Sequence, residues 1–197
     1  MNNIQKLSGG VALALTAVIG SIISIEGGYS NHPDDTGGAT MYGITESVAR
    51  ANGYEGPMQE LPLEVAENTY MSSYIVAPRY DEIFELSKGV GSKLIDSGVN
   101  VGTHRATKWF QESLNALNRG GRDYPEVAAD GIIGPATIAA YRSLVEVREA
   151  SKACKLVLKL LDVHQGYHYI NLKQHNSFTV GWIDKRVQNV PLSTCDE

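Results

Sequence analysis

The sequence predicts a mainly α-helical fold with one small β element. Three observations support this prediction: apolar residues recur at helical spacing along most of the chain, alternating strand patterns are nearly absent, and one glycine-rich stretch has the composition of a tight hairpin. The chain has 197 residues, of which 43% are hydrophobic. That is enough to bury a core in one domain, or in a small domain with an appended lobe.

The first expected element is a helix in residues 7–25, a run of 19 residues without a charge. Ten of the 19 are Gly, Ala, Ser or Thr. The run only just reaches the roughly 20 residues that span a bilayer. Three interpretations follow: a cleaved secretory signal, a buried core helix, or a marginal membrane anchor that can leave the bilayer and pack on the protein. We take the releasable anchor as the working expectation.

The elements that follow are placed by turn and capping signals. Residues 27–43 hold five Gly, one Pro and two Asp, which is typical of a tight loop or a short β-hairpin. Thr45 is suited to cap a helix ending near residue 52, and Pro135 to open one. After the helix capped by Thr45, one helix is expected to start after Pro62 and to run to about residue 75. Further helices are expected over residues 91–99, 103–117, 135–147 and 150–172, with a long loop over residues 118–135.

Charge and cysteine content exclude several classes of protein. The formal net charge of −5 excludes a basic nucleic-acid-binding chain. Residues 1–88 hold 4 Lys and Arg against 11 Asp and Glu, whereas residues 89–197 hold 13 against 11. The two cysteines exclude a disulfide-dense scaffold and a four-cysteine zinc site. Whether Cys154 and Cys195 pair, as they would in an oxidising compartment, stays open.

The candidate catalytic residues lie around the glycine-rich stretch. Glu26 ends the apolar run, where burial would raise the pKa of its carboxyl and keep it protonated. Asp35 follows nine residues later in a polar loop that would keep it charged, although Asp34 is an alternative to it. Carboxyls in contrasting environments can divide the roles of acid and base. Thr40 is placed to hold a water or a substrate hydroxyl.

The string EGGYSNHPDDTGGATMYGIT, residues 26–45, resembles the signature of glycoside hydrolase family 108, a group of N-acetylmuramidases of phage endolysins and bacteria. Its spacing is also similar to the Glu–Asp–Thr constellation of T-even phage lysozymes, although Thr40 is one residue nearer to the aspartate. The resemblance implies a lysozyme-like α+β fold, with a helical bundle and a hairpin that bears the second carboxylate. It implies that Glu26 is the general acid and that Asp35 positions or activates water.

The resemblance continues along the chain. Residues 92–115 match the family's helix–break–helix, residues 130–137 (DGIIGPAT) are similar to the hallmark of a peptidoglycan-binding-like helical module, and Gly181-Trp182 is similar to the family's closing motif. The expected organisation is therefore an apolar helix in residues 1–25 that is also the first helix of the catalytic lobe, a muramidase region in 26–104, a peptidoglycan-binding-like module in 105–187 and a tail in 188–197. The DGIIGP string also has a plain structural explanation as a turn that opens a helix.

Further residues are candidates for substrate binding or for a metal. Tyr29, Tyr42 and Tyr74, with Tyr70, are suited either to stack on sugars or to pack in the core. Asn100 is suited to line the sugar groove or to satisfy amides at a helix break. His164 and His168 have the i, i+4 spacing of zinc ligands but no third ligand or glutamate base nearby, so no metal site and no cofactor are expected.

The sequence thus predicts a peptidoglycan hydrolase that cleaves the β-1,4 bond between N-acetylmuramic acid and N-acetylglucosamine, as an endolysin does for host cell lysis. The alternatives are a non-catalytic peptidoglycan-binding protein and a zinc-dependent amidase or peptidase. We expect a monomer whose partner is peptidoglycan, with no nucleic acid. Its location would be the host inner membrane and then the periplasm if residues 7–25 form a releasable anchor, as in signal-arrest-release endolysins, and otherwise the host cytoplasm until lysis.

Overall fold

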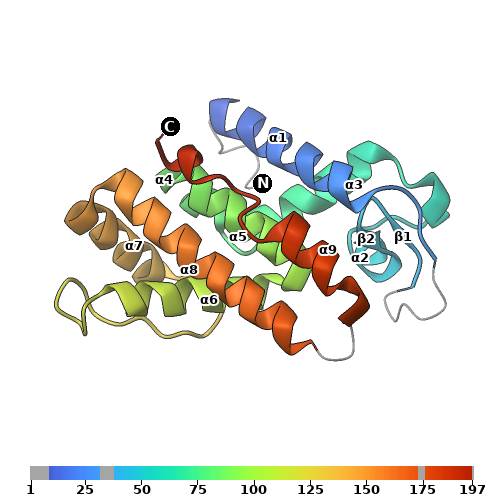
Figure 1. The fold of residues 1–197 in the computed structure, drawn as a ribbon. Coiled ribbons are helices and arrows are strands. Elements are labelled where there is room, and N and C mark those ends of the chain that lie inside the picture. Colours follow the sequence, from blue (N-terminus) through green and yellow to red (C-terminus); the bar gives the residue numbers. More distant parts are fainter. Residues whose placement is uncertain (1–8, 32–37, 173–175, 197) are drawn as a thin grey trace. The chain divides into compact units, whose positions relative to one another are not determined.

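The chain forms two compact units, Met1–Ala77 and Pro78–Glu197, both built mainly of helices (Figure 1). The computed structural model describes residues 9–31, 38–172 and 176–196, without the side chains of residues 25, 26, 176 and 177. The only sheet in the described residues is a two-stranded antiparallel hairpin. The mainly helical fold with one small β element is therefore confirmed.

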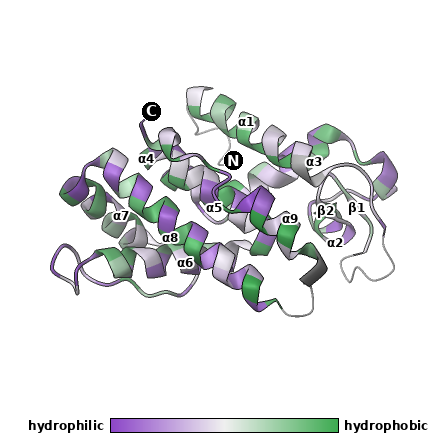
Figure 2. Cartoon of the chain, in the orientation of Figure 1, coloured by the Kyte–Doolittle hydropathy of each residue, from purple (hydrophilic) through white to green (hydrophobic). Residues whose placement is uncertain are grey.

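The first unit opens with α1 (Gly9–Glu26), which covers the expected apolar helix. Leu15, Ile19 and Ile22 are buried on the face that meets the helices α3 and η3. The opposite face carries small or weakly polar residues such as Ala17 and Ser21, so α1 is green to white along most of its length in Figure 2. In this structure α1 packs on the first unit along one face, as both a core helix and a released anchor would, so the choice between these two interpretations of residues 7–25 stays a prediction.

Membrane crossing was the third interpretation of the same run. Among the helices that the structure describes, none combines the length and the apolar character that a bilayer span requires.

The hairpin joins β1 (Thr40–Met41) to β2 (Ile44–Thr45), with Thr40 opposite Thr45 and Met41 opposite Ile44. Its two-residue turn, Tyr42-Gly43, has positive φ at both positions, 54° and 75°, which is the conformation that matches the twist of the strands. Thr45 then caps α2 (Glu46–Ala51) by accepting a hydrogen bond from the Val48 amide at 3.4 Å, as the sequence predicted.

After a short 3-10 turn, η2 (Met58–Glu60), the helix expected from residue 62 has two parts. It begins as α3 (Leu63–Thr69) and continues as a π-helix, η3 (Tyr70–Val76). The sequence did not predict the change of helix type, which brings Tyr70 and Ile75 into the core with no exposed surface. Such π segments often occur at functional sites.

The second unit is a bundle centred on α8 (Ala150–Asn171), drawn in orange in Figure 1. Helix α8 contacts α5 (Lys88–Val101), α6 (Thr103–Leu117), α7 (Pro135–Arg148), α9 (Asn176–Arg186) and the terminal 3-10 turn η5 (Leu192–Asp196). The helix α6 has the predicted bounds, and the break before it falls at Gly102, whereas the sequence predicted a break over residues 100–102. Pro135 opens α7 as predicted.

A further helix, α4 (Tyr80–Leu86), was not predicted. It packs against α5 so closely that a Cβ at Gly91 would lie 2.4 Å from the Cα of Phe84. Only glycine at this position allows the two backbones to approach, and the contact buries Ile83 and Phe84.

The C-terminal residues are fastened to α8. Cys154 on α8 and Cys195 in η5 form a disulfide, which settles the question that the sequence left open. Close to it, the carboxylate of Asp196 accepts hydrogen bonds from the ammonium of Lys155 at 2.6 and 2.9 Å. The expected tail is therefore a structured part of the second unit.

Candidate active site

The first candidate residue, Glu26, is the last residue of α1. Gly27 follows it with φ of +81° and donates its amide hydrogen to the Ile23 carbonyl at 3.1 Å. This arrangement ends a helix in the left-handed conformation that glycine adopts without strain. The two glycines after Glu26 thus end the helix directly after the residue that carries the carboxyl. The side chain of Glu26 lies outside the described residues.

The loop that follows is closed at its base by one antiparallel bridge. The Ser30 amide donates to the Thr40 carbonyl at 3.0 Å, and the Thr40 amide donates to the Ser30 carbonyl at 2.8 Å. Asp34 and Asp35 belong to the segment between these anchors and lie outside the described residues, so their roles stay a prediction. The bridge nevertheless keeps both ends of the segment beside the hairpin, and the importance of Ser30 was not predicted.

Thr40 itself is held by its backbone rather than by its side chain. Its hydroxyl lies 3.5 Å from the Ser30 carbonyl, at the outer limit of a hydrogen bond. A hydroxyl so weakly engaged retains the capacity to bind a water or a substrate hydroxyl. The geometry is compatible with the predicted role of Thr40 and does not test it.

The structure links two of the candidate sugar-binding tyrosines through a third. The buried Tyr70 hydroxyl donates to the Tyr42 carbonyl at 2.8 Å, and the rings of Tyr70 and Tyr74 lie 5.5 Å apart. Because Tyr70 has no exposed surface, it packs in the core and cannot stack on a sugar. Tyr42 and Tyr74 are partly exposed and Tyr29 is 40% exposed, so these three side chains remain available to a ligand.

Asn100 belongs to the second unit and lies in the last turn of α5. Its amide oxygen accepts a hydrogen bond from the Tyr169 hydroxyl at 2.5 Å, and that hydroxyl also accepts one from the Gln165 amide at 2.9 Å. Asn100 thus links α5 to α8 by a hydrogen bond. This is a structural role, as was the option that Asn100 satisfies amides at a helix break. Its part in substrate binding stays a prediction.

The DGIIGPAT string has the structural role that its residue types suggested. Asp130 accepts hydrogen bonds from the Ile132 amide at 3.0 Å and from the side chain of Gln111 at 2.9 Å, and the Gln111 side-chain oxygen accepts the Gly131 amide at 2.8 Å. The bond from Gln111 holds the pKa of the Asp130 carboxyl below its ordinary value. Gln111 is almost fully buried. It organises this loop from 20 residues away in sequence, and no local signal identified it.

The two histidines spaced i, i+4 pack on one tryptophan. The His164 ring stacks on Trp109 with centroids 6.0 Å apart, and His168 is tilted against the same ring at 5.6 Å. Arg105 donates to Nε2 of His168 at 3.2 Å. Burial lowers the pKa of both imidazoles. Within the described residues, no group of three or more His, Cys, Asp or Glu is arranged to hold a metal ion.

Comparisons with known proteins match each half of the chain to the kind of domain that the sequence predicted for it. Residues 19–102 match the family described as Glycosyl hydrolase 108, and residues 105–187 match the one described as Predicted Peptidoglycan domain. No curated protein matches the chain.

One solved structure is similar to nearly the whole chain. The chain is similar to the structure of Brucella abortus SagA over 92% of each chain, with 26% sequence identity and a TM-score of 0.69. The similarity covers nearly the whole chain and supports the lysozyme-like α+β fold. Residues 19–102 thus match the glycosyl hydrolase 108 family, and together with the peptidoglycan domain that follows, this match identifies the chain as a peptidoglycan hydrolase.

Proposed function

We propose that the chain is an N-acetylmuramidase, a lysozyme that hydrolyses the β-1,4 bond between N-acetylmuramic acid and N-acetylglucosamine. Glu26 donates a proton to the leaving oxygen, and Asp35 supports the attack of water or the positively charged transition state. The observation that carries the proposal is the place of Glu26 at the end of α1, directly before a loop that the Ser30–Thr40 bridge closes. Thr40 orients the water or a sugar hydroxyl from the base of this loop.

The position of Glu26 is suited to an acid because of its place on the helix. The carbonyl groups at the C-terminal end of a helix carry a partial negative charge, which opposes ionisation of a carboxyl there. A carboxyl that keeps its proton near neutral pH is what a glycosidic leaving group requires. We expect the carboxyl of Asp35 to stay hydrated and charged, because its neighbours in the sequence are Gly, Asp and Thr. The two carboxyls therefore take different roles.

The proposal is tested by replacing Glu26 with glutamine, which keeps the size of the side chain but removes its proton. We expect Glu26→Gln to lower the release of reducing ends from purified peptidoglycan by about 10³-fold or more, because a positioned general acid contributes 10²–10⁴-fold. The matched control is Glu64→Gln on the exposed surface of α3, which should keep wild-type activity. Both variants should have wild-type melting temperatures. Normal lysis by Glu26→Gln would exclude Glu26 as the acid.

The same assay separates the two alternative functions. If the chain only binds peptidoglycan, the wild type itself releases no reducing ends. A zinc-dependent amidase or peptidase releases amines in place of reducing sugars and is inhibited by chelators.

The proposal also includes the compartment and the biological role. The Cys154–Cys195 disulfide supports action in an oxidising compartment such as the periplasm, because such bonds are rare in the cytosol. We propose host cell lysis as the role, with a transient stage in the inner membrane through residues 7–25. Cell fractionation should find the chain in the inner membrane first and in the periplasm after depolarisation. A chain found only in the cytosol, and released only by a separate pore protein, would reject the anchor.

A further inference from the structure

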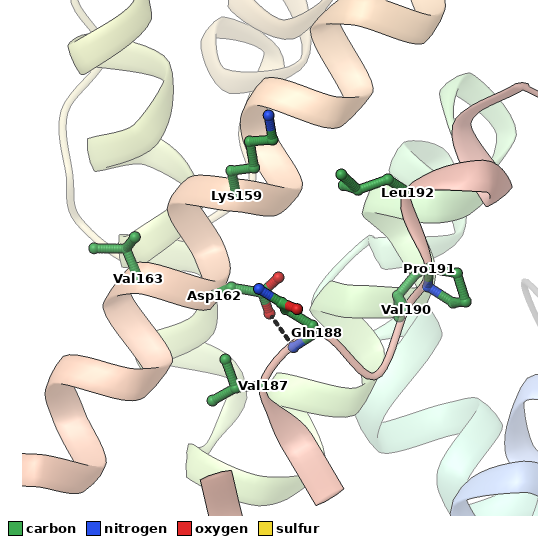
Figure 3. A pocket seen from close by; sticks show the side chains of 8 residues that line it. All are labelled: Lys159, Asp162, Val163, Val187, Gln188, Val190, Pro191 and Leu192. Atoms are coloured by element: carbon green, nitrogen blue, oxygen red, sulfur yellow. Dashed lines mark hydrogen bonds between the residues drawn. The ribbon is translucent and has the colours of Figure 1, made fainter. Parts of the chain in front are cut away.

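The second unit contains a groove that is lined by none of the residues proposed for catalysis. It runs between α8 and the C-terminal segment, residues 187–196 (Figure 3). Its volume of about 500 Å³ is within the range of ligand-binding sites. The residues that decide its chemistry are Lys159, Asp162, Val163, Val187, Val190 and Leu192.

The C-terminal segment forms one side of the groove and is fastened near both of its ends. Near its start, the Gln188 amide donates to the Asp162 carboxylate at 2.9 Å, the contact drawn in Figure 3. Near its end, the Cys154–Cys195 disulfide joins it covalently to α8. A groove whose sides are held in this way exists before a ligand arrives, so that binding costs less ordering of the chain.

Two charged side chains line the groove, Lys159 and Asp162. Asp162 lies 2.6 Å from the ammonium of Lys93, which is fully buried behind it, so the negative charge of Asp162 is already balanced. Lys159 is exposed one turn earlier on α8. In the part of the chain that the structure describes, Lys159 forms no ion pair. The groove therefore favours a ligand with a carboxylate.

The remaining surface of the groove is aliphatic. Val163 is 65% exposed and Leu192 is 38% exposed, so the groove offers apolar surface that a ligand can contact. None of the described lining residues is aromatic, so the groove lacks the flat rings on which sugars stack. Its chemistry fits a peptide with small apolar side chains and a carboxylate better than it fits a glycan.

We propose that this groove binds the stem peptide of peptidoglycan, the short acidic peptide with alanine residues that is attached to muramic acid. Lys159 pairs with a peptide carboxylate, and the aliphatic side chains contact the methyl groups of the alanines. This inference rests on peptidoglycan as the ligand of the chain, and it does not depend on which glycosidic bond is cut. It assigns the peptide to the second unit and leaves the glycan to the site that contains Glu26.

The test uses the full chain with labelled valine and leucine methyl groups and a synthetic stem pentapeptide that ends in D-Ala-D-Ala. We expect the peptide to shift the methyl resonances of Val163, Val187 and Leu192. Lys159→Glu should raise the dissociation constant by about fivefold or more, because it replaces an attraction by a repulsion. The matched control is Lys152→Glu, an exposed lysine on the same helix, which should leave affinity unchanged. Amidation of the peptide's C-terminus should weaken binding to the wild type.

Three results would overturn the proposal: equal affinities of Lys159→Glu and Lys152→Glu, methyl shifts confined to residues outside the groove, or the same shifts caused by tetra-N-acetylchitotetraose, which has no peptide. The peptide contains no glycosidic bond, so its binding is independent of hydrolysis. Glu26→Gln should therefore bind it like the wild type. If the chain binds the peptide but cuts no glycan, the proposed muramidase function is wrong and the peptide-binding proposal still holds.

Discussion

Two neighbouring aspartates compete for one role in the proposed mechanism. Asp34 and Asp35 both lie between the anchors Ser30 and Thr40, and the composition of the loop suits either an acid–base residue or an Asx turn at each position. The resemblance to the family favours Asp35. Substitution of each aspartate in turn separates the two possibilities.

We expect Asp35→Ala to lower the rate of wall hydrolysis by about 10²-fold, less than Glu26→Gln, because solvent partly replaces a group that positions water. Asp34→Ala, the matched control, should stay within about twofold of the wild type, because the proposed mechanism gives Asp34 no part in proton transfer. Initial rates on purified sacculi, with melting temperatures as a check of folding, measure both. The reverse order would assign the role to Asp34.

The histidines on Trp109 make a prediction about acid stability. Burial is the main cause that lowers the pKa of both His164 and His168, and the charge of Arg105 adds to the effect on His168. Below the unfolded-state pKa of about 6.5, the unfolded chain therefore binds more protons than the folded chain. The free energy of unfolding should fall as the pH drops below this value, and this contribution should vanish above pH of about 7.5.

Urea unfolding between about pH 7.5 and 5.5 measures this dependence, because the two imidazoles of the unfolded chain change charge within that window. The double variant His164→Gln/His168→Gln should show a smaller loss of stability on acidification than the wild type. Equal losses in the two proteins would show that these imidazoles do not cause the dependence.

Candidate residues for the chemistry could be named where the signal is local, whereas the buried polar residues could not be predicted. Glu26 is a candidate because the end of an apolar run meets two consecutive glycines there, and its role stays a prediction. Lys93 looks like an ordinary polar position of a helix, yet it is fully buried between Asp162 and Asn189. Its partners lie 69 and 96 residues away, so that only the tertiary structure brings the compensating groups together.

At the scale of elements, capping and periodicity were sufficient for the long helices. Apolar spacing predicted α6 and α8, and Pro135 marked the start of α7. The tight turn at Tyr42-Gly43 followed from the glycine-rich composition. These features depend on local chemistry and therefore need no knowledge of the rest of the fold.

The elements that were not predicted depend on tertiary contacts. The helix α4 has only seven residues, follows a residue with positive φ (Arg79, 62°) and is stabilised by packing against Gly91. The helix α9 has no clear amphipathic pattern, and the π-helix η3 differs from an α-helix by a shift of hydrogen bonding that residue spacing does not reveal. Packing, rather than local preference, decides each of these three.

The disulfide makes a prediction for the element that it fastens. It closes a loop of 41 residues, and the loss of chain entropy in the unfolded state predicts a stabilisation of about 4 kcal/mol. Cys195→Ser should lower the free energy of unfolding in urea by about this amount. The reduced wild type should match the variant, whereas a loss below about 1 kcal/mol would show that the bond is not a main constraint.

At the scale of the whole molecule, the compact units do not coincide with the two families. The hydrolase family extends to residue 102, but the first compact unit ends at Ala77, so α4 and α5 pack in the unit that contains the peptidoglycan domain. The buried residues Leu94 and Ile95 of α5 are part of its core. Residues 78–102, the last part of the hydrolase region, thus have a structural role in the unit that contains the peptidoglycan domain.

This arrangement predicts which fragments fold. Residues 78–197 should give a cooperative thermal transition as an isolated fragment, whereas residues 105–197 should not, because removal of α4 and α5 uncovers the core and leaves Asp162 without Lys93. Circular dichroism during heating distinguishes the two. A cooperative transition of the shorter fragment would mean that the domain needs no part of the hydrolase region.

The sequence predicted the family and the general activity because the motif that follows Glu26 is short and contiguous. The division into a catalytic region, a binding module and a tail, and the monomeric state, remain predictions. The bond that is cut is implied by the resemblance of residues 26–45 to N-acetylmuramidases, and a direct measurement of the products tests it.

Mass spectrometry of the soluble products from sacculi digested by the wild type is that measurement. The account predicts disaccharide peptides with N-acetylmuramic acid at the reducing end, which borohydride converts to the alcohol. Products with N-acetylglucosamine at the reducing end, or peptides released from intact glycan strands, would contradict it.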